Sequence, residues 1–250
     1  MASNANVSNP IQIVPLHGAE VTKAGATPQL TYRGGPLISN VQVFTVFWGQ
    51  AWTQSPQSDL IQQINGFFDY VLTSSLIDQL AEYSTQTQTI GYGSRTGTAT
   101  VTSPDVGQSV ADADIQTMLQ NQITSNSAFP QPSANTLYFV YFPSGVTVEQ
   151  GGSSSCQAFC GYHDNINGQI FYAVEPYPDC SGCAGNMAVF DALTTTSSHE
   201  LCEAITDPIP GQGWYDDTNG EIGDICAWQT KQLGSYTVQE EWSNQGNSCV

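Results

Sequence analysis

Two stretches of the chain, 37–49 and 136–142, carry apolar side chains at nearly every position. A strand that is covered on both faces has this pattern, so both stretches predict buried central strands of a sheet. Residues 89–101 alternate through three glycines and predict an exposed strand or hairpin. A turn sequence at 164–168 precedes an apolar stretch at 169–174, which predicts a further strand.

Four segments place apolar residues three and four positions apart, which is the spacing of one helix face. The first segment, 59–71, has Asp59 in the N-cap position, and the second begins at Ser75. The third begins near Asp112 and also keeps its apolar residues on one face. The longest runs from Met187 to Thr206, where Asp207-Pro208 ends it because proline cannot continue a helix.

The predicted elements alternate between helix and strand early in the chain and become irregular later, with a last strand at 236–242. The sequence shows no internal repeat, no low-complexity linker and no second core. This organisation predicts an α/β or α+β fold, a single domain with a mixed sheet and one long helix. Residues 1–36 show little periodicity, so we expect a polar arm along the surface of a domain at 37–250.

Charge narrows the classes of partner. The chain of 250 residues has 22 acidic and 4 basic residues, and its formal net charge is -18. Four cations cannot neutralise a run of phosphates, which argues against nucleic acid, and an anionic membrane surface would repel the chain. Most carboxylates have no cation to pair with, so they lie in solvent or bind metal.

The chain contains no run of about 18 apolar residues, so we expect no membrane span. The first ten residues are polar and do not resemble a signal peptide. Abundant Ser, Thr, Gln, Asn and Gly with scarce lysine nevertheless favours a secreted protein. The pattern carries no signal for an oligomeric state.

All seven cysteines follow residue 155: Cys156, Cys160, Cys180, Cys183, Cys202, Cys226 and Cys249. The first four form two close pairs, which predict local disulfides or a cross-linked pair of loops. The spacings C-x3-C and C-x2-C also allow a four-thiolate zinc knuckle as an alternative. We expect Cys226 and Cys249 to pair, and Cys202, inside the long helix, to be a buried free thiol.

The long helix contains the strongest chemical signal. His199, Glu203 and Asp207 lie at i, i+4 and i+8, roughly on one stripe, and Glu200 follows His199. The zinc-peptidase motif H-E-x-x-H uses this geometry: two ligands hold the metal and the intervening Glu is the general base. Here the second His is replaced by Glu203, whose carboxylate is also an acceptable zinc ligand.

A downstream segment strengthens this interpretation. Glu221 follows Glu203 by 18 residues, and Asp224 comes three residues later. One branch of the zinc peptidases places a third ligand and a bracing Asp at such spacings. The sequence therefore predicts a metal, zinc or alternatively calcium, held by His199, Glu203 and Glu221 with Glu200 as base. Asp224 and Asp207 are expected to support these ligands or to replace one of them.

Other interpretations stay open. The helix residues could be buried polar groups that satisfy one another, or a metal-free acid–base site. His163 could be a further ligand, a transition-state donor, or only a turn residue, and we expect His17 to be solvated. No G-x-S-x-G elbow and no lysine-containing phosphate loop is present, which argues against a serine hydrolase and a nucleotide-binding protein.

Residues 34–250 resemble the plant exordium, or phosphate-induced protein 1, family. The resemblance is carried by Gly34-Gly35-Pro36, Phe47-Trp48-Gly49, Cys160-Gly161-Tyr162-His163, Cys180 with Cys183, His199-Glu200-Leu201-x-Glu203, Trp214-Tyr215, Glu221-Ile222-Gly223-Asp224-x-Cys226 and Cys249. The chain lacks the Gly-rich insert that plant members carry after Cys226, and it differs at Cys202 and Asp207. The resemblance implies a secreted, cell-wall-associated protein with a shared site, without implying peptidase activity.

The sequence therefore predicts a secreted, zincin-like metal-dependent hydrolase that acts on a peptide or cell-wall substrate. Among hydrolases, it favours a zinc endopeptidase. The alternative is a non-catalytic extracellular or cell-wall protein in which the metal or carboxylate cluster is structural. Glu200 beside His199 favours the enzyme, because a structural site needs no base there. The missing second histidine favours the alternative.

Overall fold

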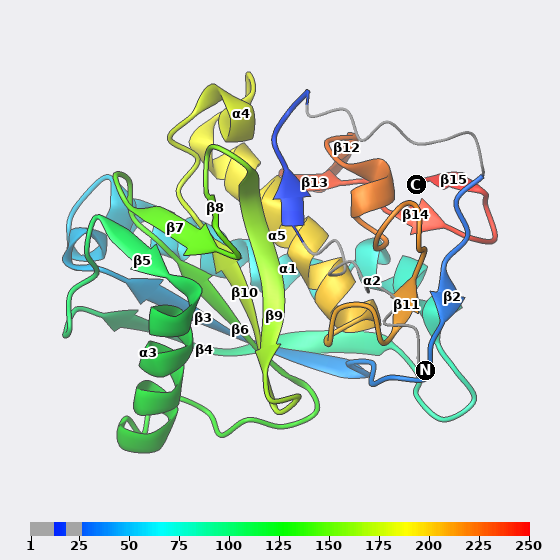
Figure 1. The fold of residues 1–250 in the computed structure, drawn as a ribbon, viewed down its shortest axis with the longest axis horizontal. Helices are drawn as coiled ribbons and strands as arrows, with labels where there is room; N and C mark the ends of the chain where they lie inside the picture. The colour runs from blue at the N-terminus through cyan, green and yellow to red at the C-terminus, as the bar shows by residue number, and fades with distance from the viewer. Residues whose placement is uncertain (1–12, 19–26) are drawn as a thin grey trace, which may run out of the picture.

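A mixed six-stranded sheet organises the molecule (Figure 1). The structure is a computed structural model that describes residues 13–18 and 27–250. The strand order is β1-β9-β10-β6-β3-β4, and the sheet is formed by β1 (Ile13–Pro15), β3 (Asn40–Trp48), β4 (Gly91–Val101), β6 (Thr136–Tyr141), β9 (Phe159–Ile166) and β10 (Ile170–Glu175). The four strands from β10 to β4 are parallel, and β9 and β1 are antiparallel to their neighbours. The fold is an α/β single domain, as the sequence predicts.

The two apolar stretches form the centre of the sheet. Every residue of β6 is buried, and so are the last six residues of β3. In β4, at the edge, buried or half-buried positions alternate with exposed ones along most of the strand. The predicted exposed strand is therefore confirmed as a single strand, and its glycines let β3 approach closely: a Cβ on Gly93 would lie 2.3 Å from the carbonyl oxygen of Val41.

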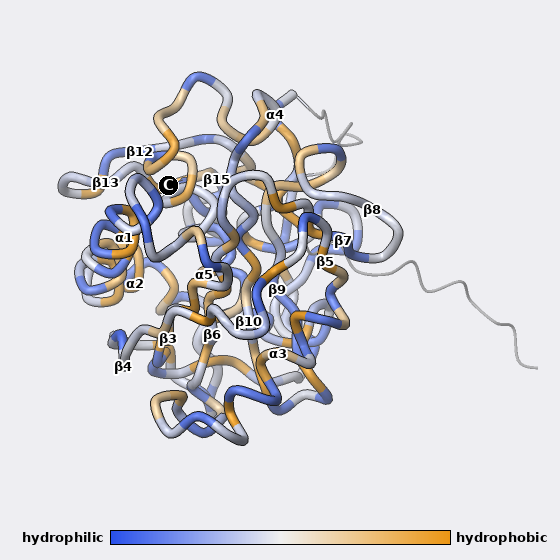
Figure 2. The backbone as a smooth tube through the Cα atoms, turned by 90° about the vertical axis from the view of Figure 1, so that its left-hand side faces the viewer, coloured by the Kyte–Doolittle hydropathy of each residue, from blue (hydrophilic) through white to orange (hydrophobic). Residues whose placement is uncertain are grey.

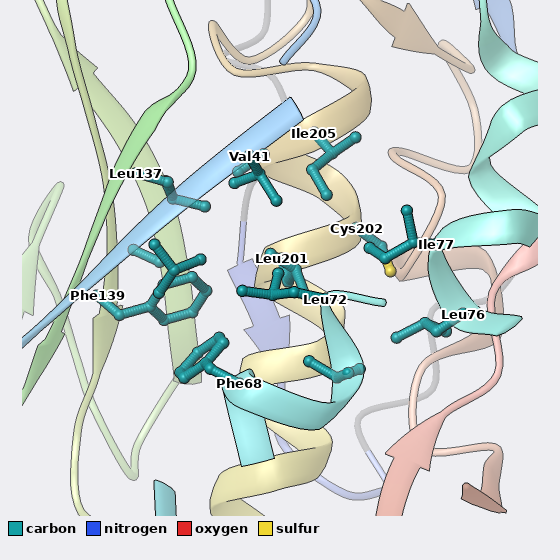
Figure 3. Packing of buried hydrophobic residues seen from close by; sticks show 14 of the residues in the cluster. Val41, Phe68, Leu72, Leu76, Ile77, Leu137, Phe139, Leu201, Cys202 and Ile205 are labelled. Atoms are coloured by element: carbon teal, nitrogen blue, oxygen red, sulfur yellow. The ribbon is translucent and has the colours of Figure 1, made fainter. Parts of the chain in front are cut away.

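Helices cover both faces of the sheet. They are α1 (Gln57–Val71), α2 (Ser75–Leu80), α3 (Asp112–Ser125), α4 (Ser181–Ala184) and α5 (Val189–Thr206). On one face α1, α2 and α5 pack against side chains such as Leu137 and Phe139 of β6, as Figure 3 shows. On the other face α3 packs against Tyr138 and Val140 of the same strand. Successive side chains of β6 thus point to opposite faces of the sheet and contribute to two hydrophobic cores.

Helix α5 is a central helix rather than a surface one. Every residue from Ala192 to Thr206 is buried, because β9, β10, α1 and the C-terminal strand β13 all pack against it. The helix predicted at 187–206 is confirmed to within two residues. Its polar residues are therefore enclosed in the protein, where an unpaired charge is costly.

The remaining elements are short. The strands are β2 (Thr31–Tyr32), β5 (Ser109–Ala111), β7 (Thr147–Gln150), β8 (Ser153–Ser154), β11 (Trp214–Tyr215), β12 (Thr230–Leu233), β13 (Tyr236–Gln239), β14 (Trp242–Ser243) and β15 (Ser248–Cys249). The 3-10 helices are η1 (Gln50–Thr53), η2 (Ala81–Tyr83) and η3 (Asp224–Cys226). The strand predicted at 236–242 is divided between β13 and β14. Figure 2 shows β12, β13 and β15 on one side of the molecule, close to the C-terminus.

Part of the N-terminal arm belongs to the sheet. Ile13–Pro15 pairs with β9, and Val14 is fully buried, so the expectation of a surface arm is wrong for these residues. His17 is half-buried and its ring stacks on Trp228 at 3.6 Å, which corrects the expectation that it is solvated. The arm residues 1–12 and 19–26 lie outside the described residues.

The predicted turn at 164–168 is shorter than expected. Strand β9 continues to Ile166, so the turn is reduced to residues 167–169, of which Asn167 and Gly168 have positive φ. His163 consequently lies within a strand and is not a turn residue.

Three disulfides close the C-terminal half. They join Cys156 to Cys180, Cys160 to Cys183, and Cys226 to Cys249. The two close pairs therefore cross-link two loops, which uses up the thiols that a zinc knuckle would need. Cys202 is a buried free thiol, as predicted. Among the described residues, no helix is long and apolar enough to span a bilayer.

Candidate metal centre

Helix α5 and strand β9 bring two histidines and two glutamates together. His199, Glu200 and Glu203 come from α5, and His163 comes from β9. Side chains alternate along a strand, so His163 shares a face with Gly161, and a Cβ on Gly161 would lie 3.2 Å from Glu200 Oε1. The face of β9 that carries His163 is therefore the face that packs on α5.

Glu203 lies between the two imidazoles. Its Oε1 is 2.9 Å from His199 Nε2, and its Oε2 is 3.5 Å from His163 Nδ1. His163 Nδ1 also lies 3.1 Å from Glu200 Oε2. Donor atoms on a tetrahedral zinc with bonds of about 2.0 Å lie about 3.3 Å apart. The observed separations fall on either side of that value.

The downstream acidic segment reaches the same cluster. Glu221 Oε1 lies 3.5 Å from His163 Nε2. One ligand atom each of His199, Glu203 and Asp224 lies within 4.8 Å of the other two. The backbone N–H of Asp224 donates to Glu203 Oε1 at 3.1 Å, and Asp224 Oδ2 accepts from the N–H of Glu221 at 3.0 Å. The structure thus brings both predicted downstream residues to the helix.

Asp207 has a different place. Its carboxylate accepts the backbone N–H groups of Gly211, Gln212 and Gly213, which shapes the loop after α5. Its carbonyl oxygen lies 3.1 Å from His163 Nε2. These contacts make Asp207 a residue that positions His163, since most of its carboxylate's bonding capacity is used by the loop.

Hydrogen bonding fixes which nitrogen of His163 faces the carboxylates. A carbonyl oxygen can only accept, so the Nε2 that contacts Asp207 carries a hydrogen. In the neutral ring, Nδ1 then presents a lone pair to Glu200 and Glu203. A lone pair and two carboxylates attract a cation between them, either a metal ion or a proton. One group that could hold a metal is His163, Glu200 and Glu203.

The bonds around His199 favour a different role for that ring. Its Nδ1 lies 2.8 Å from Gln239 Nε2. The Gln239 amide also donates to the carbonyl of Gly223 at 2.9 Å and accepts the N–H of Trp228 at 3.0 Å, which fixes its orientation. His199 Nδ1 is therefore an acceptor, and the hydrogen of the neutral ring is on Nε2, the nitrogen nearer Glu203.

The cluster is shielded from solvent and from basic residues. The side chains of His199, Glu200 and Glu203 are 0% exposed, and that of His163 is 1% exposed. In the described part of the chain, Arg33 and Arg95 pair with carboxylates of other regions, and Lys231 donates to Gln79. Histidine is the cation in all the ion pairs that the cluster forms among the described residues.

Burial and neighbouring charge shift these pKa values. Burial favours the neutral ring of His163, but its contacts with Glu200 and Glu203 outweigh burial and raise its pKa to about 10. Burial raises the pKa of Glu200 to about 7, although both histidines oppose it. For Glu203, burial is outweighed by the charge of His199 and the contact with His163, so its pKa falls to about 2. When no metal is bound, a proton on His163 can therefore serve as the cation.

The sequence did not reveal several residues next to the site. Gln239 orients His199, and Glu175 and Glu241 are buried acids whose pKa values burial raises well above their usual range. One signal was available: Glu175 is an acidic residue directly after the apolar run of β10. A charge at the end of a buried strand is a reason to look for a site.

No protein-family model matches this chain, and no curated protein matches it. Function must therefore be inferred from the geometry of the cluster: four buried side chains, from one helix and one strand, that could hold a metal.

Proposed function

We propose that this chain is a metal-dependent hydrolase that holds zinc in the buried cluster, with Glu203 as the central ligand. The observation that carries the proposal is His163, whose Nδ1 faces Glu200 and Glu203 while its Nε2 is bound to a carbonyl. A divalent cation satisfies all three groups at once. Protein ligands of the His and Glu type, with no thiolate, are typical of catalytic rather than structural zinc sites.

The hydrogen bonds favour zinc on the His163 side of Glu203. There the neutral form of the ring has the tautomer that a ligand needs, and the carbonyl of Asp207 holds its other nitrogen, as in many zinc sites. Zinc on Nε2 of His199 would require the hydrogen to move to Nδ1 and the Gln239 amide to turn. With zinc on the His163 side, Glu200 is a ligand, and His199 Nε2 lies 2.9 Å from the other oxygen of Glu203, Oε1.

Zinc with an open coordination position would supply an activated water for hydrolysis. The chain's own residues would position the ligands: the carbonyl of Asp207 holds His163, the backbone N–H of Asp224 donates to Glu203 Oε1, and Glu221 lies beside His163 Nε2. A peptide or cell-wall polymer is the substrate class that we propose, in keeping with a zincin-like enzyme.

Complete burial favours a second candidate, a non-catalytic protein with a structural metal. His199, Glu200 and Glu203 are 0% exposed, and a polymer cannot reach a site in that state. A hydrolase therefore has to open, whereas a structural site does not. Turnover separates the two candidates.

The experiment compares metal content and turnover in Glu200→Gln, Glu203→Gln and the control Glu241→Gln. Glu241 is also buried, and burial favours its neutral form, so an amide there should change little. We expect zinc content to fall at least tenfold in both site variants and to stay unchanged in the control. Zinc retained in Glu200→Gln with turnover lost would instead make Glu200 the base and place zinc beside His199. A zinc-loaded wild-type protein that cleaves neither peptides nor polysaccharides would support the structural candidate.

Secretion and membership of the exordium-like proteins also belong to this proposal. Three disulfides in one domain are typical of proteins that fold in an oxidising compartment. The motifs of that family include His163, His199, Glu203 and Glu221, which come together in this fold. Their convergence supports a shared site.

A further inference from the structure

Strand β1 lies at the sheet edge beside the metal centre, although it comes from the far end of the sequence. It is antiparallel to β9, and Val14 is opposite Gly161. Paired residues of neighbouring strands point to the same face, so Val14 points toward α5, as Gly161 does. Gly161 has no side chain to fill this space, and a Cβ there would lie 3.2 Å from Glu200 Oε1. Val14 is 0% exposed.

The strand also contacts the other side of the cluster. Besides β9, its neighbours include α5 and η3, the short helix that begins at Asp224. Val14 packs with Cys160 and Cys183, which form one of the disulfides. The N-terminal strand thus closes the edge of the sheet where β9, α5 and η3 meet, which helps to explain why the metal centre is shielded from solvent.

β1 is held in the way that proteins hold an extended peptide. Main-chain pairing with β9 is complemented by Trp228, whose Nε1–H donates to the carbonyl of Pro15 at 2.8 Å. The N–H of His17 donates to the carbonyl of Gly182 at 2.7 Å, and the His17 ring stacks on Trp228. Backbone bonds give such a complex its affinity, and pockets for alternate side chains give it specificity.

We propose that the groove formed by β9, Trp228 and the Cys160–Cys183 disulfide is a binding site for extended, uncharged peptides. Residues 13–17 are its intramolecular occupant. The inference rests on the proposed function and deepens it, because it names an extended peptide as the ligand that approaches the metal centre. A ligand would place an aliphatic side chain opposite Gly161 and a ring on Trp228. Displacement of residues 13–17 would open the site from the sheet edge.

The occupant is a peptide rather than a sugar, because the groove is lined by main-chain partners. The edge of β9 that pairs with β1 would, once residues 13–17 are displaced, offer N–H and C=O groups at strand spacing, which an extended peptide matches and a polysaccharide does not. The side-chain contacts of Val14 are apolar, so a carboxylate at that position would be buried without a cation.

The test uses a chain that lacks residues 1–18 and a synthetic peptide with the sequence of residues 11–18. We expect saturable binding in calorimetry and a change in tryptophan fluorescence that is lost in Trp228→Phe. The matched control is the same peptide with Val14→Asp, which should bind at least tenfold more weakly. A folded, truncated chain that binds neither peptide, or binds both equally, would overturn the inference.

A second readout covers the case in which the truncated chain does not fold. In the full-length chain, Val14→Asp and Trp228→Ala should release zinc to a chelator at least tenfold faster than wild type. Trp228→Phe keeps a ring that can stack on His17, so its rate of zinc release should lie between those of wild type and Trp228→Ala. Equal release rates in folded variants would overturn the inference.

The two readouts also separate this inference from the proposed function. If the protein binds the peptide but contains no zinc, the proposed hydrolase function is refuted and the proposed peptide groove is retained. If the protein binds zinc but not the peptide, the peptide groove is refuted and the proposed metal centre is retained.

Discussion

If the buried cluster holds zinc, as we propose, removal of the metal should destabilise the protein measurably. A ligand that binds only the folded state stabilises it by about 2.7 kcal/mol when its free concentration is 100 times the dissociation constant. For a chain of this length, 1 kcal/mol shifts the melting temperature by about 2–4 °C. We therefore expect a chelator to lower the melting temperature by about 5–10 °C, and zinc in excess to restore it.

The size of this effect should depend on pH. When zinc is removed, His163 takes a proton, and its pKa is about 10 against 6.5 for a free imidazole. A raised pKa gives stability that is complete below 6.5 and is lost as pH rises toward 10, by about 1.4 kcal/mol per pH unit at most. The metal-free protein should therefore weaken between pH 7 and pH 9. The stabilisation by zinc should increase over the same interval.

Differential scanning calorimetry with zinc and with chelator, at pH 7 and at pH 8.5, measures both effects. Glu203→Gln should abolish the difference between the two conditions, whereas Asp69→Asn, at an exposed ion pair with Arg95, should leave it intact. Metal analysis of the same samples gives the occupancy. A melting temperature that zinc does not change at either pH, in a protein that binds no zinc, would refute the reasoning.

Three further predictions concern the frame around the site. Loss of the Cys226–Cys249 disulfide in a double Ser variant should cost about 3 kcal/mol in denaturant unfolding, because it closes a loop with a sequence separation of 23; an unchanged midpoint would contradict this. Gly161→Ala should cost about 1–3 kcal/mol, since its Cβ would lie 2.6 Å from a methyl group of α5, whereas Gly107→Ala, whose nearest neighbour is at 3.4 Å, should be near neutral. Burial lowers the pKa of His17, so the residue 11–18 peptide should bind at full strength above pH 6.5 and more weakly as pH falls; constant affinity from pH 8 to pH 5 would exclude this.

The sequence predicted the elements whose pattern reflects a single environment. Strands β3 and β6 are buried on both faces, and a continuous apolar run has no other good place in a sheet of this kind. Helix α5 was found for a related reason: its apolar residues repeat at helical spacing, and Pro208 stops it. The boundaries of these elements lie at most three residues from the predicted ones.

Strand β9 was not predicted because residues next to the candidate site interrupt its apolar pattern. Gly161 and His163 face α5, and these are positions where an ordinary strand would carry aliphatic residues. A glycine and a polar residue between cysteines are typical of a turn, and the pairing of β9 with β1 joins residues about 145 positions apart. Local pattern carries little information on a pairing of that separation.

The site was predicted in its residues and not in its arrangement. Helical spacing placed His199 and Glu203 on one stripe, and the structure puts them 2.9 Å apart. The ring whose Nδ1 faces the two glutamates is that of His163, which the sequence treated only as one option. The roles of the two histidines depend on Gln239 and on the carbonyl of Asp207, and one-dimensional spacing does not contain those contacts.

Burial of acidic side chains relates the composition of this protein to the chemistry of its candidate site. A chain with 22 acidic and 4 basic residues can keep its carboxylates soluble at no cost by leaving them on the surface. It instead buries Glu200, Glu203 and Glu221 around His163, where each lost hydration shell must be replaced by a cation or a proton. Protons can neutralise the cluster only while its carboxylates or histidines are protonated, and these protons are lost as pH rises. A divalent ion replaces several protons at one position and keeps the cluster neutralised through the neutral and alkaline range, so an acidic protein of this composition gains from a metal where a basic one would use lysine.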